Sequence, residues 1–176
     1  ARIAAPRLGW AAFALMLGGA TLVEVIMWAG KADVLFTSYV PLKADPLYYL
    51  GIILFAVGAL LVCGIFFANL VVARRERTYT GSLPLVVYGA VTAAIIAVIT
   101  LLHGAAIYIP TFLWSVGLVA HIDSLMYRTV WWAFGHSSQQ INVSAHVAVW
   151  YAVAAIVFGA KPLSEKVSRT AFLLYI

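Results

Sequence analysis

Charged residues are scarce in this chain, and their scarcity indicates the environment in which it folds. Only 10% of its 176 residues are charged, whereas soluble domains carry about a quarter. Hydrophobic residues make up 65% of the sequence, and the mean hydropathy is +1.02. This composition excludes an ordinary soluble domain and indicates a polytopic membrane protein.

Cysteine and the common soluble-enzyme motifs are also missing or nearly so. The single cysteine, Cys63, lies within an apolar run, so no intramolecular disulfide can form, and a small buried hydrophobic side chain is its simplest role. The sequence has no phosphate-binding glycine loop, hydrolase motif or internal repeat. The net charge of +5 does not indicate nucleic acid as a partner, because the basic residues sit between apolar segments. The expected partner of these surfaces is the lipid bilayer.

Long apolar segments predict an all-α fold, a polytopic bundle of transmembrane helices forming a single domain over residues 1–176. Each segment reaches the roughly 20 residues that a membrane-crossing helix needs. The runs are continuous rather than alternating, which argues against strands. The expected elements are four full spans and the truncated start of a fifth: residues 8–30, 47–73, 85–108, 128–160 and 171–176.

The chain begins at Ala1 without an initiator methionine and ends inside an apolar segment. We interpret it as an internal piece of a larger polytopic protein. The alternative is a small intact protein with a disordered tail.

Basic residues alternate between successive loops and predict the orientation in the membrane. They are concentrated before the first span, after the second and after the fourth: Arg2, Arg7, Arg74, Arg75, Arg77, Lys161, Lys166 and Arg169. The positive-inside rule therefore places the N-terminus and these two loops in the cytoplasm, with the protein multi-pass in a prokaryotic-type cell (inner) membrane. The loops near residues 31–46 and 110–123 are expected outside.

One stretch of the fourth span carries polar side chains where apolar ones are expected, around His136, Gln140 and Asn142. Polar groups at bilayer depth are costly unless each has a partner, so they mark a candidate functional site. At about 100° per residue, Gln140 lies one turn beyond His136 on the same face, and Tyr151 returns to within about 60° of it. These three residues can form one inward-facing polar track, with Asn142 on roughly the opposite side.

Position alone leaves three interpretations of His136. It is a structural histidine bonded to a neighbouring helix, a proton-relay group, or a metal ligand, since imidazole binds Cu, Fe and Zn. None of the other histidines (His103, His121 and His146) has a metal-ligand spacing with it. Any metal at His136 would therefore need ligands from outside these residues.

The sequence around His136 resembles a known family. The run Trp132-Ala133-Phe134-Gly135-His136 is similar to the Trp-x-x-Gly-His signature of subunit I of the heme-copper oxidases, in which this histidine ligates copper. Further segments resemble B-family members in the same order and at similar spacing over nearly the whole chain: residues 36–43, 49–51, 113–119, 123–129 and 168–173.

This resemblance implies a larger catalytic subunit, and it implies cofactors that this chain alone cannot hold. The subunit would have roughly twelve helices, of which these are about the third to the sixth, with the low-spin and high-spin heme ligands elsewhere. His136 would be one copper ligand, and an adjacent histidine pair downstream would complete the copper site. The chain would then be part of a respiratory oxidoreductase, inactive alone. Its implied partners are other subunits and an electron donor such as cytochrome c, a quinol or a copper subunit.

The main departure from the family lies at Gln140, which we therefore name as the candidate catalytic residue. Oxygen-reducing members carry a tyrosine there, and an amide cannot supply a proton and an electron as a phenol can. Nitric oxide reductases of the superfamily lack this tyrosine, so Gln140 favours reduction of NO. The alternative is an oxygen-reducing cytochrome c or quinol oxidase whose tyrosine comes from another helix.

Three further residues have roles implied by the resemblance beside plainer ones. Tyr151 matches a proton-pathway tyrosine of the B family and could equally be an interfacial anchor. Glu24, the only carboxylate within a predicted span, could serve a proton route or bond to a neighbouring helix. Trp132 would pack beside the copper site or be ordinary core. A non-catalytic membrane protein, in which His136 and Gln140 only join helices, remains the alternative to a redox enzyme.

Overall fold

Most of the described residues lie in helices. The computed structural model describes residues 3–78 and 80–176, and no strand occurs among them. The helices are α1 (Pro6–Trp28), α2 (Pro46–Arg75), α3 (Leu85–Ser115), α4 (Ser124–Phe158) and α5 (Glu165–Leu173). The first four are long and apolar enough to cross a membrane. The all-α, membrane-spanning fold class predicted from the sequence is therefore confirmed.

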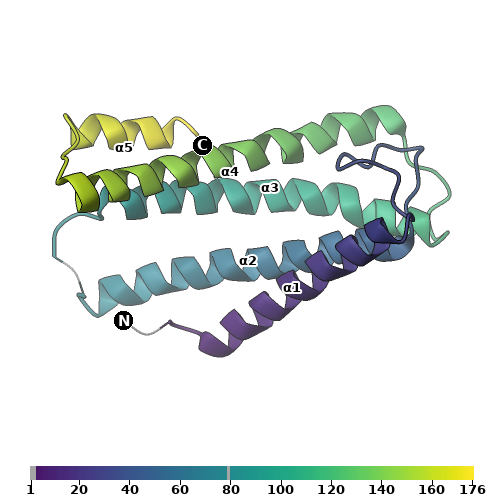
Figure 1. The fold of residues 1–176 in the computed structure, drawn as a ribbon, viewed down its shortest axis with the longest axis horizontal. Helices are drawn as coiled ribbons and strands as arrows, with labels where there is room; N and C mark the ends of the chain where they lie inside the picture. Colours follow the sequence, from purple (N-terminus) through teal and green to yellow (C-terminus); the bar gives the residue numbers. More distant parts are fainter. Residues whose placement is uncertain (1–2, 79) are drawn as a thin grey trace.

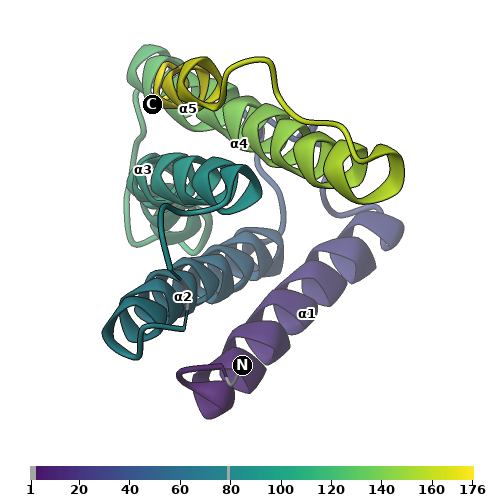
Figure 2. The ribbon, with the colours of Figure 1, turned by 90° about the vertical axis from the view of Figure 1, so that its left-hand side faces the viewer.

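The four long helices lie roughly side by side in an elongated bundle, with α3 in contact with α2, α4 and the short α5, while α1 packs mainly against α2 (Figures 1 and 2). Two ends result. The basic end carries the start of α1, residues 76–78 and 80–84, and the loop 159–164. The aromatic end carries the loops 29–45 and 116–123 (Figure 1). Seven of the basic residues named above lie at or next to the basic end, namely Arg7, Arg74, Arg75, Arg77, Lys161, Lys166 and Arg169, while Arg2 lies outside the described residues.

Local sequence signals explain where the helices begin. Pro6 and Pro46 occupy first-turn positions, where a missing N–H costs no hydrogen bond. The carboxylate of Asp123 accepts a hydrogen bond from Met126 N at 2.6 Å, and Ser164 Oγ accepts one from Val167 N at 3.3 Å. These caps satisfy backbone donors that the first helical turn leaves free.

The predicted boundaries need correction at three places. The third helix continues seven residues past 108, because Pro110 lies inside it without ending it. The fourth begins at 124 rather than 128, since Asp123 caps it. The fifth runs over Glu165–Leu173 rather than 171–176, because its N-cap is Ser164 and its first half is polar. Hydropathy alone locates the apolar part of a helix, whereas caps decide its ends.

Glycines allow close helix contacts, as the small residues in the spans predict. A Cβ added to Gly19 would lie 2.5 Å from the carbonyl oxygen of Gly51, so α1 and α2 touch backbone to backbone. A Cβ at Gly104 of α3 would lie 2.9 Å from the ring of Phe134 on α4. Gly18, in contrast, faces open space.

The loop 29–45 folds back into the bundle at the aromatic end, where tyrosine hydroxyls from three helices hold it. Tyr127 donates to Thr37 O at 3.1 Å, and Tyr108 donates to Phe36 O at 3.4 Å. Tyr49 accepts a hydrogen bond from Ala44 N at 3.0 Å. Buried loop backbone needs such partners, because unpaired polar groups are costly away from water. We call this assembly the tyrosine-held loop.

Candidate functional site

His136 lies near the middle of α4 and faces a cavity of about 310 Å³. Its imidazole is exposed. The cavity is bordered by α3, by α4 and by the residues that follow α5, namely Ile96, Ile99, Trp132, Ala133, His136, Ser137, Gln140, Tyr175 and Ile176. The walls are mostly apolar, so the imidazole and the Gln140 amide are its main polar groups apart from the two hydroxyls.

Gln140 contacts His136 directly. Its Nε2 lies 3.4 Å from Nε2 of His136, one helical turn away. In this contact the Gln140 amide N–H donates and Nε2 of His136 accepts. The two residues therefore share a face of α4, as their spacing predicts.

This arrangement fits copper only as part of a larger ligand set. Within residues 3–78 and 80–176 there is no group of three or more His, Cys, Asp or Glu side chains that could hold a metal ion. His136 offers one exposed imidazole, a donor that suits copper. His103 is engaged elsewhere, with Nδ1 2.9 Å from the carbonyl oxygen of Ile99. The chain thus contributes a single candidate ligand.

The opposite face of α4 is filled by Trp131, which the sequence analysis did not single out. Its side chain is 2% exposed, and Nε1 donates to Tyr108 Oη at 3.3 Å. Its ring lies against Gly135, where any Cβ would clash with it. Packing of Trp131, one turn earlier, therefore requires glycine at position 135. This is a physical reason for the glycine that precedes His136. The spacing of four residues between a tryptophan and a glycine was the available signal.

Trp132 lies between the two faces. Its side chain is 44% exposed and lines the His136 cavity, while its ring meets the Trp131 ring edge-on with centroids 5.0 Å apart. Trp132 and His136 thus border the same cavity.

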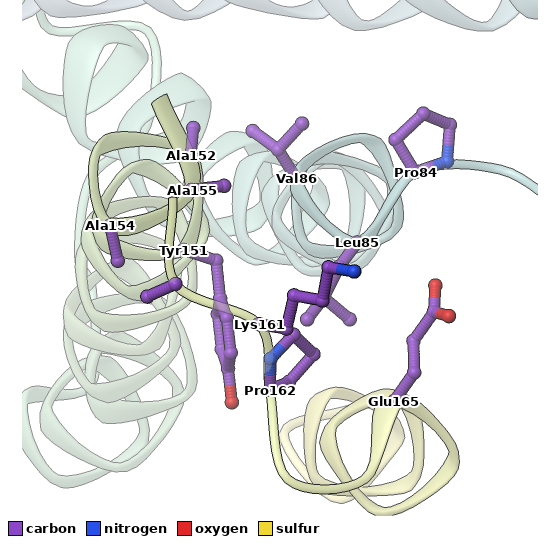
Figure 3. A pocket seen from close by; sticks show the side chains of 11 residues that line it. Pro84, Leu85, Val86, Tyr151, Ala152, Ala154, Ala155, Lys161, Pro162 and Glu165 are labelled. Atoms are coloured by element: carbon purple, nitrogen blue, oxygen red, sulfur yellow. The ribbon is translucent and has the colours of Figure 1, made fainter. Parts of the chain in front are cut away.

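Tyr151 lies at the basic end of the same helix, far from His136. Fifteen residues separate them, which is about 22 Å along a helix axis. The Tyr151 hydroxyl donates to Ser168 Oγ on α5 at 2.9 Å. Figure 3 shows this hydroxyl reaching toward α5 beside a second cavity, of about 590 Å³. The hydrogen-bonding partner Ser168 was not anticipated, because the pairing depends on how α5 folds back.

Glu24 lies neither at the His136 cavity nor beside Tyr151. It is exposed near the aromatic end of α1, a helix that packs mainly against α2 rather than α4. His136, Gln140 and Trp132 thus form one group, Tyr151 a second, and Glu24 stands apart.

Comparison with known proteins gives consistent matches. The family model described as cytochrome c and quinol oxidase polypeptide I matches residues 1–176. The chain is 30% identical to cytochrome c oxidase subunit 1 of Thermus thermophilus, over 97% of its own length and 31% of that protein's length.

A solved structure of a heme-copper terminal oxidase dimer superimposes with a TM-score of 0.87 at 28% sequence identity. The match covers 97% of this chain and 30% of that one. The chain therefore spans less than a third of the length of these relatives.

Proposed function

Because the chain belongs to the family of cytochrome c and quinol oxidase polypeptide I, we propose that it supplies one copper ligand, His136, to a heme–copper centre that reduces a small gas in a respiratory chain. The contact between His136 and Gln140 beside a mostly apolar cavity carries this proposal. Low-spin heme, high-spin heme and the remaining copper ligands would come from segments beyond these residues.

The chain's own residues would prepare the site. The unprotonated Nε2 of His136 would bind copper in place of the Gln140 amide N–H. Trp132 and Ile96 line the cavity with apolar surface and limit the access of water. Bound copper would supply a redox-active Lewis acid beside the heme iron. Gln140 would offer an amide donor to a polar atom of the bound gas.

Gln140 favours NO as the substrate. The residue occupies the position where oxygen-reducing relatives are expected to carry a tyrosine, and an amide has no phenolic proton and electron to give. Coupling two NO molecules needs only two electrons and two protons, which the metals and solvent can supply. Gln140 is thus a residue suited to a two-electron reaction.

Reduction of O2 is the second candidate. The curated relative and the solved structure described above are named as a cytochrome c oxidase subunit and a terminal oxidase. In this version a tyrosine from another helix would replace the one missing at position 140.

The same proposal gives the membrane orientation of the chain, its electron donors and its proton routes. The chain would lie in the cell (inner) membrane with its basic end in the cytoplasm, within a complex that receives electrons from cytochrome c, a quinol or a copper subunit. Tyr151, at the basic end, would take up protons from the cytoplasm for the reaction. Glu24 stays a candidate for a separate proton route from the aromatic end.

Turnover of the intact complex tests the substrate. We expect faster consumption of NO than of O2 per complex, with heme and copper both present in its metal analysis and absorption spectrum. A complex without heme or copper would defeat the enzyme interpretation altogether. Rapid four-electron reduction of O2 would instead establish the second candidate.

The variant Gln140→Leu, which keeps the size but removes the amide, isolates the role of Gln140. It should lower NO turnover while copper content stays unchanged. Asn142→Leu, a matched change on roughly the opposite face of α4, should leave NO turnover unaltered.

A further inference from the structure

Tyr151 is held by a partner on α5 that also fixes the direction of its proton. Ser168 Oγ donates to the carbonyl oxygen of Ser164 at 3.1 Å and accepts from the Tyr151 hydroxyl at 2.9 Å. Because the serine proton is already used, the tyrosine must be the donor in this pair. The phenolic proton therefore points at Ser168, and the lone pairs of the phenolic oxygen are left free.

The cavity beside Tyr151 can hold water. Its volume is about 590 Å³, and Lys161 and Glu165 line it together with Tyr151 (Figure 3). Charged groups and ample room are the conditions under which buried space is wet. It opens at the basic end, where the loop 159–164 joins α4 to α5.

The position of α5 is fixed by strong contacts, so Ser168 cannot drift from Tyr151. Arg169 Nη2 donates to Leu83 O at 2.7 Å, to Ser82 Oγ at 2.9 Å and to Glu165 Oε1 at 2.8 Å. Phe172 is 1% exposed, and its ring centroid lies 6.0 Å from that of Tyr151. Arg169 and Phe172, which both follow Ser168 on α5, thus anchor this helix to the rest of the bundle.

We infer that Ser168 is a positioning residue for proton entry, which holds the Tyr151 hydroxyl with its free lone pairs accessible to the cavity. The inference rests on the proposed proton-carrying role of Tyr151. Water in the cavity would pass a proton to a free lone pair of the phenolic oxygen. The hydroxyl would then turn away from Ser168 and release one proton toward the reaction site. The phenol stays neutral after each transfer, and no electron moves.

The test compares variants of the full-length subunit in its intact complex, reconstituted in vesicles. Ser168→Ala should slow proton uptake from the basic-end side at least about fivefold, the factor that corresponds to one lost hydrogen bond. A pH-sensitive dye on that side measures the uptake during a burst of turnover. Ser168→Thr, which keeps the hydroxyl, should restore the rate.

Thr170→Ala is the matched control. Thr170 Oγ1 also donates to a backbone carbonyl one turn earlier, Lys166 O at 3.1 Å, but Thr170 is exposed. This variant should take up protons at the unaltered rate. Where Ser168→Ala does not assemble, Ser168→Cys keeps the size with a weak acceptor and should show the same slowing.

Tyr151→Phe separates failure of the inference from failure of the proposed proton route. Slow uptake in Tyr151→Phe with normal uptake in Ser168→Ala would overturn the inference alone. Normal uptake in Tyr151→Phe would overturn the proton route through Tyr151 and the inference with it. Slow uptake in both single variants, without further slowing in the double variant, is the result expected.

Discussion

The two faces of α4 differ in how far their side chains are buried and hydrogen-bonded by the rest of the chain. On one face Trp131 is almost fully buried, bonds to Tyr108 and packs against Phe36 and Phe134 with ring centroids 5.6 and 5.9 Å apart. On the other, the imidazole of His136 is exposed, and Gln140 is its only hydrogen-bonding neighbour among the described residues.

On this single helix, one face therefore serves packing and the other presents the candidate functional side chains. The Trp131 face is closed by contacts with α3 and the tyrosine-held loop, so it fixes the position and rotation of α4. The His136 face keeps a polar group available for a ligand. A rigid element that packs on one side and presents a donor on the other is what a metal site requires.

Removing the imidazole should have the largest effect on the chemistry. Loss of a residue that only hydrogen-bonds to a metal ligand costs about 10–100-fold in metal affinity. Loss of the ligand itself in His136→Ala should therefore lower copper affinity at least about 100-fold. Copper per complex, measured by elemental analysis after dialysis, checks this. His146→Ala on the same helix should retain copper, and copper retained in His136→Ala would contradict the proposed ligand.

Truncating Trp131 should cause the largest loss of stability. Replacement of a buried tryptophan by alanine costs about 3–5 kcal/mol, because it leaves a cavity. The free energy of unfolding of the subunit in mixed micelles measures the loss. Trp150→Ala, which changes a 66% exposed side chain of α4, should alter stability by about 0.5 kcal/mol or less. Equal losses in the two variants would remove the distinction between the faces.

Adding one methyl group at Gly135 should destabilise α4 through the Trp131 ring. Overpacking of this kind costs about 1–3 kcal/mol. Gly64→Ala is the matched control, because nothing lies within 4 Å of its Cβ position, and alanine should stabilise α2 there by up to about 1 kcal/mol. The free energy of unfolding should fall in Gly135→Ala and rise in Gly64→Ala. A stabilising Gly135→Ala would refute the clash.

The smallest effect is expected at the tyrosine-held loop. Tyr127→Phe removes the hydrogen bond to Thr37 O and should cost about 1 kcal/mol. Tyr88→Phe is the control, since its hydroxyl makes no hydrogen bond among the described residues. Faster hydrogen exchange of loop amides in Tyr127→Phe, but not in Tyr88→Phe, would show that the bond holds the loop. Unchanged exchange in both would mean that the loop is held by other contacts.

Much of the fold could be predicted from the sequence, because membrane-crossing helices are local features. The four spans and the shared face of His136 and Gln140 follow from hydropathy and helical periodicity. The ends of α3 and α4 could not be predicted as well, since Pro110 is tolerated within a packed helix and Asp123 acts as a cap outside the apolar run.

The packing around the site could be predicted less well from the sequence. Trp131 and Trp132 are adjacent in sequence and equally apolar, and only the packing decides that one is buried and the other lines a cavity. Ser168 looks like one polar residue among several in a short amphipathic segment. Its pairing with Tyr151 joins residues 17 positions apart across a turn.

The sequence by itself determined the solvent, the number of long spans and the face of α4 that carries His136 and Gln140, because these depend on composition and on a fixed helical repeat. The tertiary structure decided which side of α4 is closed by Trp131, how tyrosines hold the loop 29–45, and which serine accepts the hydrogen bond of Tyr151. Such contacts arise between segments distant in the chain, and their geometry is set by packing that no single segment contains.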